Sequence, residues 1–340
     1  MTRVRKILWW SAGLVVGGAL AFAAAVGWLS EEFRKAGPSE RDTVLIFPKG
    51  SRLPDIAERL AGAGVVSSAR VFMAGTWWLG ADRQLKAGEY RFPAGSSAYQ
   101  AMMQMKEGRL VARRLTVPEG LTVAEVQRLL AGVDGLTADE AMESVPEGSL
   151  LPETYFFAWG DTQASVQGRM KRAMEDALAE LWEKRKPGLA IRTPAEALVL
   201  ASLIEKETGR ADERARVSAV FHNRLRRGMK LQSDPTVIYG ITLGKVSLGR
   251  DLTRADLEQA NPFNTYRIDG LPPQPIANPG RAAIQAALQP LDTREIYFVA
   301  DGDGGHHFAE TLEQHNRNVQ RWRRVREAQR QGQGQTCGTC

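Results

Sequence analysis

The sequence predicts an α+β protein in which a single N-terminal transmembrane helix precedes two globular parts. Residues 7–29 form an uncharged apolar run, and a strand-turn-helix pattern then recurs three times before about residue 135. Residues 145–328 combine several helical stretches with one strand hairpin. We therefore expect a cytoplasmic N-terminus (residues 1–6), a membrane helix (7–29), two α+β parts (41–135 and 145–328) and a disordered tail (329–340).

The N-terminal apolar run is long enough to span a bilayer, which takes about 20 residues. Arg3, Arg5 and Lys6 precede it and favour a cytoplasmic N-terminus. A cleaved signal peptide is the alternative, because small residues at 19–23 resemble a cleavage site, but its apolar core should measure only about 7–15 residues. Either interpretation places the chain after about residue 35 in the periplasm or outside the cell, and the first makes it a single-pass protein of the inner membrane.

The net charge limits the kinds of molecule that the protein can bind, and the cysteine content limits its disulfides. The formal net charge is +6. A basic protein outside the cytoplasm can meet anionic wall polymers or lipid headgroups, whereas nucleic-acid binding conflicts with export. The two cysteines, Cys337 and Cys340, cannot brace a domain core; they could close a small disulfide, and the sequence does not decide whether they are oxidised.

The first globular part contains the repeat. A Pro-x-Gly turn follows a strand-like run at 47–50, 92–95 and 117–120, and each turn is followed by a helical pattern. Residues 50–57 resemble a LysM module, a type of domain that binds N-acetylhexosamine chains. The alternative is a small α+β support unit that binds no ligand.

The second part is organised around a helix predicted at residues 194–207. Thr193 and Glu196 form a capping box, Pro194 fits the first helical position, and Gly209 fits a left-handed helix end. The stretch 197–204 is apolar except for one serine, which indicates a buried helix.

Two acids, Glu205 and Glu207, end this helix. Burial and the negative end of the helix dipole would both disfavour ionisation of Glu205, which suits a general acid. Glu207 also lies above an apolar stripe, so the periodicity does not choose between them. An ordinary frayed helix end with solvated charges is the alternative.

The chain beyond this helix offers further polar candidates. Asp234 precedes Pro235 and is typical of a helix N-cap, although it could also be a partner carboxylate or a sugar contact. A long loop rich in Pro and Asn covers 261–280, and Asn278 is predicted to cap the helix that follows it through 288. A helix at 212–227 is expected to pack against the first.

A hairpin at 294–309 and a basic helix at 311–328 complete the second part. The hairpin turn holds Asp301 and Asp303 but lacks the further acids of a calcium loop. His306, His307 and His315 could suggest zinc, but we expect no metal and no cofactor, because turn acids and neutral histidines usually have structural roles.

Several motifs in series resemble the endolytic murein transglycosylase family over residues 41–328. They are Glu147-Gly148, Leu151-Pro152-Glu153-Thr154-Tyr155, Ala201 to Thr208, Ser233 to Gly240, Asn264-Thr265-Tyr266, Gly270-Leu271-Pro272-Pro273 and Gly304-Gly305-His306. The resemblance implies one membrane anchor, a LysM-like subdomain (41–135) and a catalytic domain (145–328), with Glu205 rather than Glu207 as the catalytic acid. Phe263 departs from a tyrosine common in the family.

The activity implied by the resemblance is non-hydrolytic cleavage of peptidoglycan strands at the β-1,4 bond between N-acetylmuramic acid and N-acetylglucosamine, leaving 1,6-anhydro ends. Partnership with peptidoglycan synthases, the penicillin-binding proteins, is also implied. Amide, acid and tyrosine side chains suit sugar hydroxyl and N-acetyl groups, so we expect substrate contacts from the following residues. They are Gln232, Asp234, Tyr239, Asn264 and Tyr266.

Two other functions remain open from the sequence. One is a non-catalytic wall scaffold that binds glycan through the LysM-like part. The other is a muramidase, a hydrolase in which Asp234 or Glu207 activates water as a second carboxylate. The sequence does not predict oligomeric state or glycan length preference.

Overall fold

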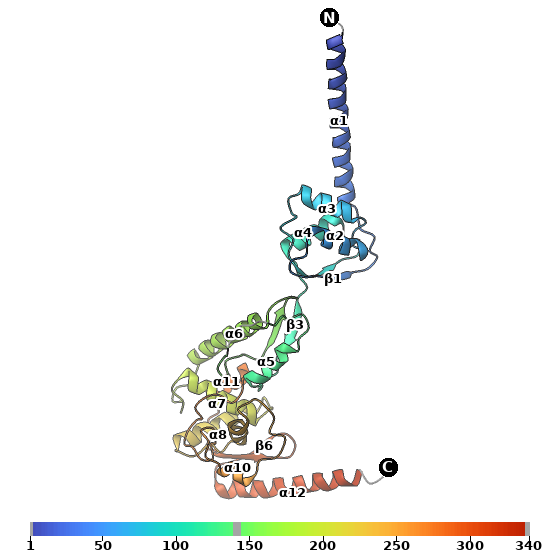
Figure 1. The fold of residues 1–340 in the computed structure, drawn as a ribbon. Coiled ribbons are helices and arrows are strands. Elements are labelled where there is room, and N and C mark those ends of the chain that lie inside the picture. The colour runs from blue at the N-terminus through green and yellow to red at the C-terminus, as the bar shows by residue number, and fades with distance from the viewer. Residues whose placement is uncertain (1–2, 139–143, 337–340) are drawn as a thin grey trace. The chain divides into compact units, whose positions relative to one another are not determined.

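Helix α1 (Arg3–Arg34) begins the part of the chain that the computed structural model describes, residues 3–138 and 144–336 (Figure 1). Within that part it is the one helix that is long and apolar enough to cross a membrane, over Gly13–Arg34. The predicted apolar run therefore lies in one continuous helix, and the expectation of a single N-terminal apolar helix is confirmed at this level.

The chain divides into two compact units. Unit 1 comprises Met1–Arg113, Gly135–Thr137 and Phe156–Asp161, and unit 2 comprises Arg114–Asp134, Ala138–Tyr155 and Thr162–Cys340. The strands β3 (Arg113–Thr116) and β4 (Thr154–Phe157) pair as a two-stranded sheet, and two of the passages of the chain between the units fall within them. A mixed α+β protein, as predicted, is confirmed.

Unit 1 combines an antiparallel strand pair with short helices. Strand β1 (Thr43–Phe47) pairs with β2 (Gly88–Phe92), and the rings of Phe47, Tyr90 and Phe92 pack together in the core. The helices are α2 (Leu53–Gly62), α3 (Ala69–Trp78) and α4 (Ala98–Glu107). Phe33, in the last turn of α1, is 4% exposed within the same core, so α1 is packed into this unit.

The three predicted strand-turn-helix copies are present. Gly50, Gly95 and Gly120 have φ values of +86°, +69° and +76°, so each turn uses the left-handed conformation that glycine adopts without strain. The third copy, which joins β3 to α5 (Val123–Ala131), lies in unit 2. The first boundary between the compact units therefore lies at residue 113, before residue 135, and the third turn is part of unit 2.

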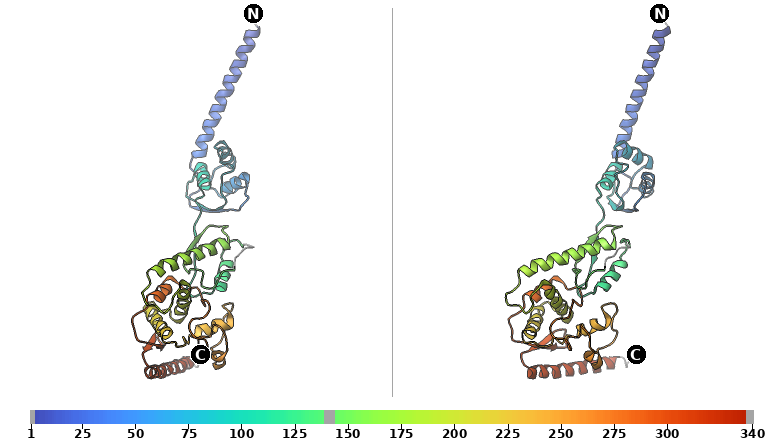
Figure 2. Two further views of the ribbon diagram at one scale, coloured as in Figure 1. Left: turned by 90° about the vertical axis from the view of Figure 1, so that its left-hand side faces the viewer. Right: turned by 60° about the vertical axis from the view of Figure 1, so that its left-hand side comes forward.

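Unit 2 is built around α7 (Pro194–Glu207), which packs most extensively against α11 and also contacts α6, α8 and α9. The other elements that follow α5 in this unit are α6 (Gln163–Glu183), α8 (Arg214–Arg226), α9 (Asp234–Thr242), α10 (Arg254–Glu258), α11 (Arg281–Leu288), β5 (Tyr297–Ala300), β6 (His306–Ala309) and α12 (Leu312–Thr336). Strands β5 and β6 form the predicted antiparallel hairpin, and α12 lies along it (Figure 2).

The beginning of α7 is as predicted, but its end differs. Thr193 accepts from the backbone amide of Glu196, whose carboxylate accepts from the amide of Thr193. The predicted left-handed end at Gly209 is wrong: Thr208 takes the C-cap in an extended conformation, with φ of −138°. The Thr208 hydroxyl accepts from the amide of Arg210, which turns the chain there without a left-handed glycine.

Three other local predictions are corrected. Ser233 occupies the N-cap position of α9, and Asp234 is the first helical residue. Asn278 does not cap α11, because Gly280 is its N-cap and the Asn278 side chain bonds to other segments. Helix α12 extends into the predicted tail as far as Thr336, while Cys337 and Cys340 lie outside the described residues.

Ser202 is the polar residue in the buried part of α7. Its hydroxyl donates to the carbonyl of Val199 and accepts from the amide of Ile276 at 3.1 Å, so it fixes the Pro-rich loop against the helix. We expect Ser202→Ala to lower the free energy of unfolding by about 1–2 kcal/mol, because the buried Ile276 amide loses its acceptor.

Urea unfolding of the Ser202→Ala variant measures this effect. Ser165→Ala is the matched control, since the Ser165 hydroxyl donates to a carbonyl one turn back but is exposed. Equal unfolding midpoints for the two variants would contradict the structural role of Ser202.

Candidate active site

Glu205 is a buried acid held at both oxygens. Its side chain is 5% exposed. Oε2 accepts from the backbone amide of Gly280 at 2.8 Å, and Oε1 accepts from Nη2 of Arg214 at 3.3 Å. The same Arg214 nitrogen donates to Glu119 at 3.0 Å, so one guanidinium bridges two carboxylates.

Burial dominates the electrostatics of Glu205. Desolvation raises the pKa of its carboxyl, and the nearby charge of Glu119 raises it further. The Gly280 amide and Arg214 act in the opposite direction without cancelling the effect of burial. A carboxyl with a raised pKa keeps a proton at higher pH than a solvated one, which suits proton donation.

Glu207 points to a different cluster. It lies two residues from Glu205, which is about 200° around an α-helix. The hydroxyl of Ser233 donates to its carboxylate, and burial raises the pKa of Glu207 to about 7. The charge of Asp234 raises this pKa and that of Arg224 lowers it. Both acids have raised pKa values, so the pKa alone does not favour Glu205 over Glu207 as the proton donor.

Glycines let two loops close around Glu205. The turn 118–120 carries Glu119, and Lys206 donates to the carbonyl of Gly120 at 3.2 Å. A Cβ at Gly280 would lie 1.8 Å from Oε1 of Glu119, so only glycine fits while Glu119 keeps this position. The turn 118–120 and the loop that ends at Gly280 thus meet at the acid.

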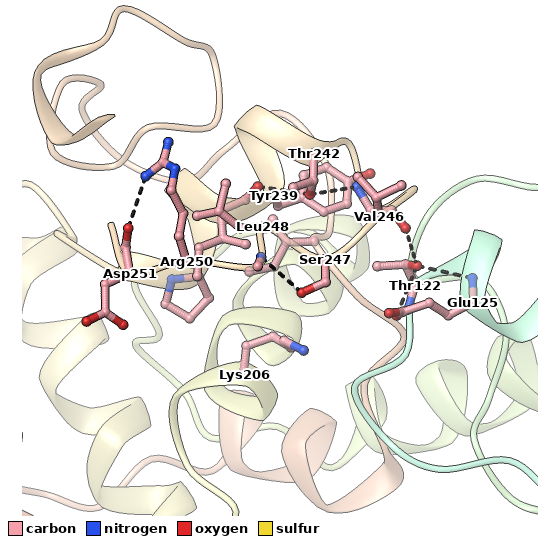
Figure 3. Close-up of a pocket in the computed structure, with 15 residues that line it drawn as sticks. Thr122, Glu125, Lys206, Tyr239, Thr242, Val246, Ser247, Leu248, Arg250 and Asp251 are labelled. Atoms are coloured by element: carbon pink, nitrogen blue, oxygen red, sulfur yellow. Dashed lines mark hydrogen bonds between the residues drawn. The ribbon is translucent and has the colours of Figure 1, made fainter. Parts of the chain in front are cut away.

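Unit 2 has a pocket of about 660 Å³, and its lining includes Lys206, the residue after Glu205 in α7, but not Glu205 itself. Figure 3 shows Lys206 entering it from the side opposite to Thr242, Ser247 and Leu248. Tyr239, from α9, also lines the pocket. Hydroxyl, apolar and cationic groups therefore surround a volume large enough for a ligand of several rings.

Tyr239 is the one member of the predicted substrate-binding set in the pocket lining. Its hydroxyl donates to Glu147 and accepts from Gln274, both at 3.3 Å, and its ring packs edge-on against Phe263. Burial raises the pKa of Tyr239 to about 12, so the hydroxyl remains neutral near neutral pH. The phenylalanine at 263 therefore supports this tyrosine.

The other four members of the set lie around the start of α9. The hydroxyl of Tyr266 donates to Asp234 at 2.6 Å, and the side-chain oxygen of Gln232 accepts from Arg224 at 3.2 Å. Asn264 is 1% exposed, and its amide donates to three carbonyls between 256 and 259. Asn264 holds the loop in this conformation and presents no free polar atom to a ligand.

The hairpin motif has a structural role near the site. Nδ1 of His306 lies 2.7 Å from Glu213, the residue before Arg214, and the backbone amide of His306 donates to the same carboxylate at 3.0 Å. Asp301 accepts two amides of its own turn. Within residues 3–138 and 144–336, no group of three or more His, Cys, Asp or Glu side chains is arranged to hold a metal ion.

The sequence did not single out Glu119, Arg214 or Gly280 as neighbours of the acid. Glu119 belongs to the third Pro-x-Gly turn, which was assigned to the first globular part on the basis of the repeat. Arg214 and Glu119 are 95 positions apart in the chain. No local pattern predicts such a pairing, since only the packed unit brings these segments together.

Buried acids with raised pKa values, near a pocket of an α+β unit, define a site of the kind that glycan-cleaving enzymes use. The model of the YceG-like family matches residues 45–321. The chain therefore belongs to the YceG-like family.

Individual relatives agree with this membership. An endolytic murein transglycosylase of Bacillus subtilis (strain 168) is 29% identical over 342 residues, covering 91% of each chain. One of Streptococcus pneumoniae serotype 2 is 29% identical over 83% of this chain, which spans 58% of that relative. A crystal structure of a yceG-like protein from Listeria monocytogenes aligns with a TM-score of 0.50 and 29% identity, covering 82% of this chain and 99% of that one.

Proposed function

We propose that this protein is a lytic transglycosylase, a lyase that cleaves peptidoglycan strands internally. The bond broken is the β-1,4 link between N-acetylmuramic acid and N-acetylglucosamine, and the product ends in 1,6-anhydro-N-acetylmuramic acid. The observation that carries the proposal is Glu205, an acid whose side chain is 5% exposed, whose pKa is raised, and whose neighbour in the chain, Lys206, lines the pocket. The name shared by the curated relatives supports the same class.

Glu205 performs both proton transfers in this mechanism. The protonated carboxyl donates to the glycosidic oxygen as the bond to C1 of the muramyl residue breaks, through an oxocarbenium-like state. The resulting carboxylate removes the proton of the muramyl 6-hydroxyl, whose oxygen attacks C1. One proton leaves Glu205 and one returns, so no water is consumed. One acid suffices because the nucleophile is intramolecular.

Arg214 and Gly280 position the carboxyl and stabilise its ionised form. Both donate to Glu205, and such charge-assisted bonds strengthen when the proton has left. Glu119 pairs with Arg214 and limits how much positive charge Glu205 experiences. This balance keeps the pKa of Glu205 raised while still stabilising the carboxylate formed in the first step.

Two substitutions should move the pH profile in opposite directions. Glu205 donates only when protonated, so activity is present below its pKa and lost as the pH rises through it. Arg214→Gln removes a group that lowers the pKa of Glu205, so activity should be lost at higher pH than in the original protein. Glu119→Gln removes a negative charge that raises the pKa of Glu205, so activity should be lost at lower pH than in the original protein. Shifts in the same direction, measured from initial rates across pH, would contradict this network.

We place the glycan in the pocket beside Lys206, whose lining also includes Tyr239. Asp234, Tyr266 and Gln232 form the proposed second set of contacts, while Asn264 supports the loop that carries Tyr266. Alanine variants of the four contact residues that remain folded and keep the original turnover would remove them from the set.

The remaining assignments complete the proposal. Residues 7–29 anchor the protein in the inner membrane, with residues 1–6 in the cytoplasm and the rest of the chain outside it. The proposed cellular role is in wall assembly and glycan chain termination. Residues 41–113, in unit 1, contain a LysM-like glycan-holding part, and unit 2, which includes the turn 118–120, forms the catalytic part. Peptidoglycan synthases are the proposed membrane partners.

Mass spectrometry of glycan strands incubated with the full chain tests the proposed reaction. Internal fragments with anhydro ends would support it. Fragments heavier by one water would instead indicate the muramidase, for which Glu207, with its pKa of about 7, is the candidate second carboxylate. Binding without cleavage would indicate the glycan-binding scaffold.

A further inference from the structure

The end of α3 exposes a contiguous group of large apolar side chains. Trp77, Trp78 and Leu79 are 69%, 55% and 46% exposed, respectively, and we call them the tryptophan patch. Trp77 and Trp78 are the last two residues of α3 and Leu79 is its C-cap, while the preceding Gly75 and Thr76 are buried in unit 1. Two adjacent exposed tryptophans are not explained by the core of this unit, and tryptophan is enriched at membrane-water interfaces.

Packing fixes this patch relative to α1. A Cβ at Gly75 would come within 2.4 Å of the ring of Phe33, so α3 and the end of α1 are in direct contact. The ring of Trp78 lies 6.3 Å from the ring of Phe22. Val26 and Leu29 of α1 line a crevice of about 190 Å³ together with Trp78 and Leu79. Trp78 and Leu79 of the patch therefore lie alongside the apolar segment of α1.

The length of that apolar segment determines what surrounds the patch. Residues 7–29 carry no charge. If the bilayer ended before Phe22, residues 7–21 would remain to cross it, about 22 Å of helix at 1.5 Å per residue. The hydrocarbon core is about 30 Å thick. A membrane crossed by α1 must therefore reach Phe22, and with it the side chain of Trp78.

We propose that the tryptophan patch inserts into the outer leaflet of the membrane that α1 crosses, as a second attachment point of unit 1. This inference rests on the proposed membrane anchor. The occupant is lipid, because the patch continues the lipid-facing surface of α1 through the Phe22 and Val26 contacts.

Fluorescence quenching in proteoliposomes tests this insertion. The full chain is reconstituted in phosphatidylcholine brominated near the carbonyl end of its acyl chains, and in the unbrominated lipid. The variant Trp77→Phe/Trp78→Phe keeps the apolar surface, so its emission subtracted from that of the original protein isolates the two tryptophans. We expect this difference emission to lose most of its intensity in the brominated lipid.

Controls separate failure of the inference from failure of the anchor. Trp182 packs against the core of unit 2, and the difference emission obtained with Trp182→Phe should not be quenched. If the patch is unquenched while the remaining tryptophans, which include Trp9 and Trp10 in α1, are quenched, protein or water covers the patch and the inference is wrong. If no emission is quenched, the anchor proposal fails and the inference fails with it.

Discussion

Glu205→Gln is expected to lower turnover on peptidoglycan strands by at least about 10³-fold, because general acid catalysis by a positioned side chain contributes about 10²–10⁴-fold and here one group serves both proton transfers. Glutamine is nearly isosteric and can still accept from the Gly280 amide, so the fold should be retained. Release of anhydro-ended fragments, followed by mass spectrometry, measures the loss. An unchanged thermal melting curve would show that the variant is folded.

Two matched variants make this result specific. Glu207→Gln changes the other acid of α7, which faces Ser233, and should retain most of the turnover. Glu175→Gln changes an exposed acid on α6 and should have no effect. If Glu207→Gln abolished cleavage while Glu205→Gln did not, the assignment of the acid would be reversed. If Glu205→Gln left the cellular role of the protein intact, the scaffold function would be favoured.

Asn278→Ala is expected to lower the free energy of unfolding by about 3 kcal/mol and to lower turnover as well. Asn278 is fully buried, and its side chain accepts from the amide of Leu150 at 2.9 Å and donates to the carbonyl of Leu121 at 2.9 Å. Alanine leaves the Leu150 amide without its acceptor and opens a cavity. Turnover falls because Asn278 ties the turn 118–121 to the loop that ends at Gly280, the donor to Glu205.

Urea unfolding and initial rates measure the two effects. Asn316→Ala, at an exposed position of α12, is the matched control and should change neither quantity. A variant of Asn278 that is destabilised but keeps full turnover would mean that the loop is positioned by other contacts.

Local patterns were sufficient for the individual elements. The capping box at Thr193 and the apolar run behind it predicted α7, and the Pro-x-Gly turns predicted three strand-turn-helix copies. Such signals depend on residues a few positions apart, so they can be recognised in the sequence. Helix ends were less predictable: Gly209 was expected to end α7, but the polar contacts of Thr208 set the end instead.

The surroundings of the acid depended on packing. The repeat assigned the third turn to the first globular part, whereas the structure uses it in unit 2 to bring Glu119 to Arg214. Asn278 was expected to cap a helix, yet its side chain joins two distant segments. Both errors have one cause, since a local motif specifies a turn or a cap but not which distant group its side chain will meet.

The sequence by itself determined the apolar N-terminal helix, the α+β class, the helix that carries two acids and, through its motifs, the family. Only the tertiary structure decided the setting of Glu205, with Arg214, Glu119 and the Gly280 amide around it, and the contact that places Trp78 beside Phe22. The physical reason is that secondary structure follows from neighbouring residues, while the desolvation and charge pairing that set a pKa arise from segments that meet only on folding.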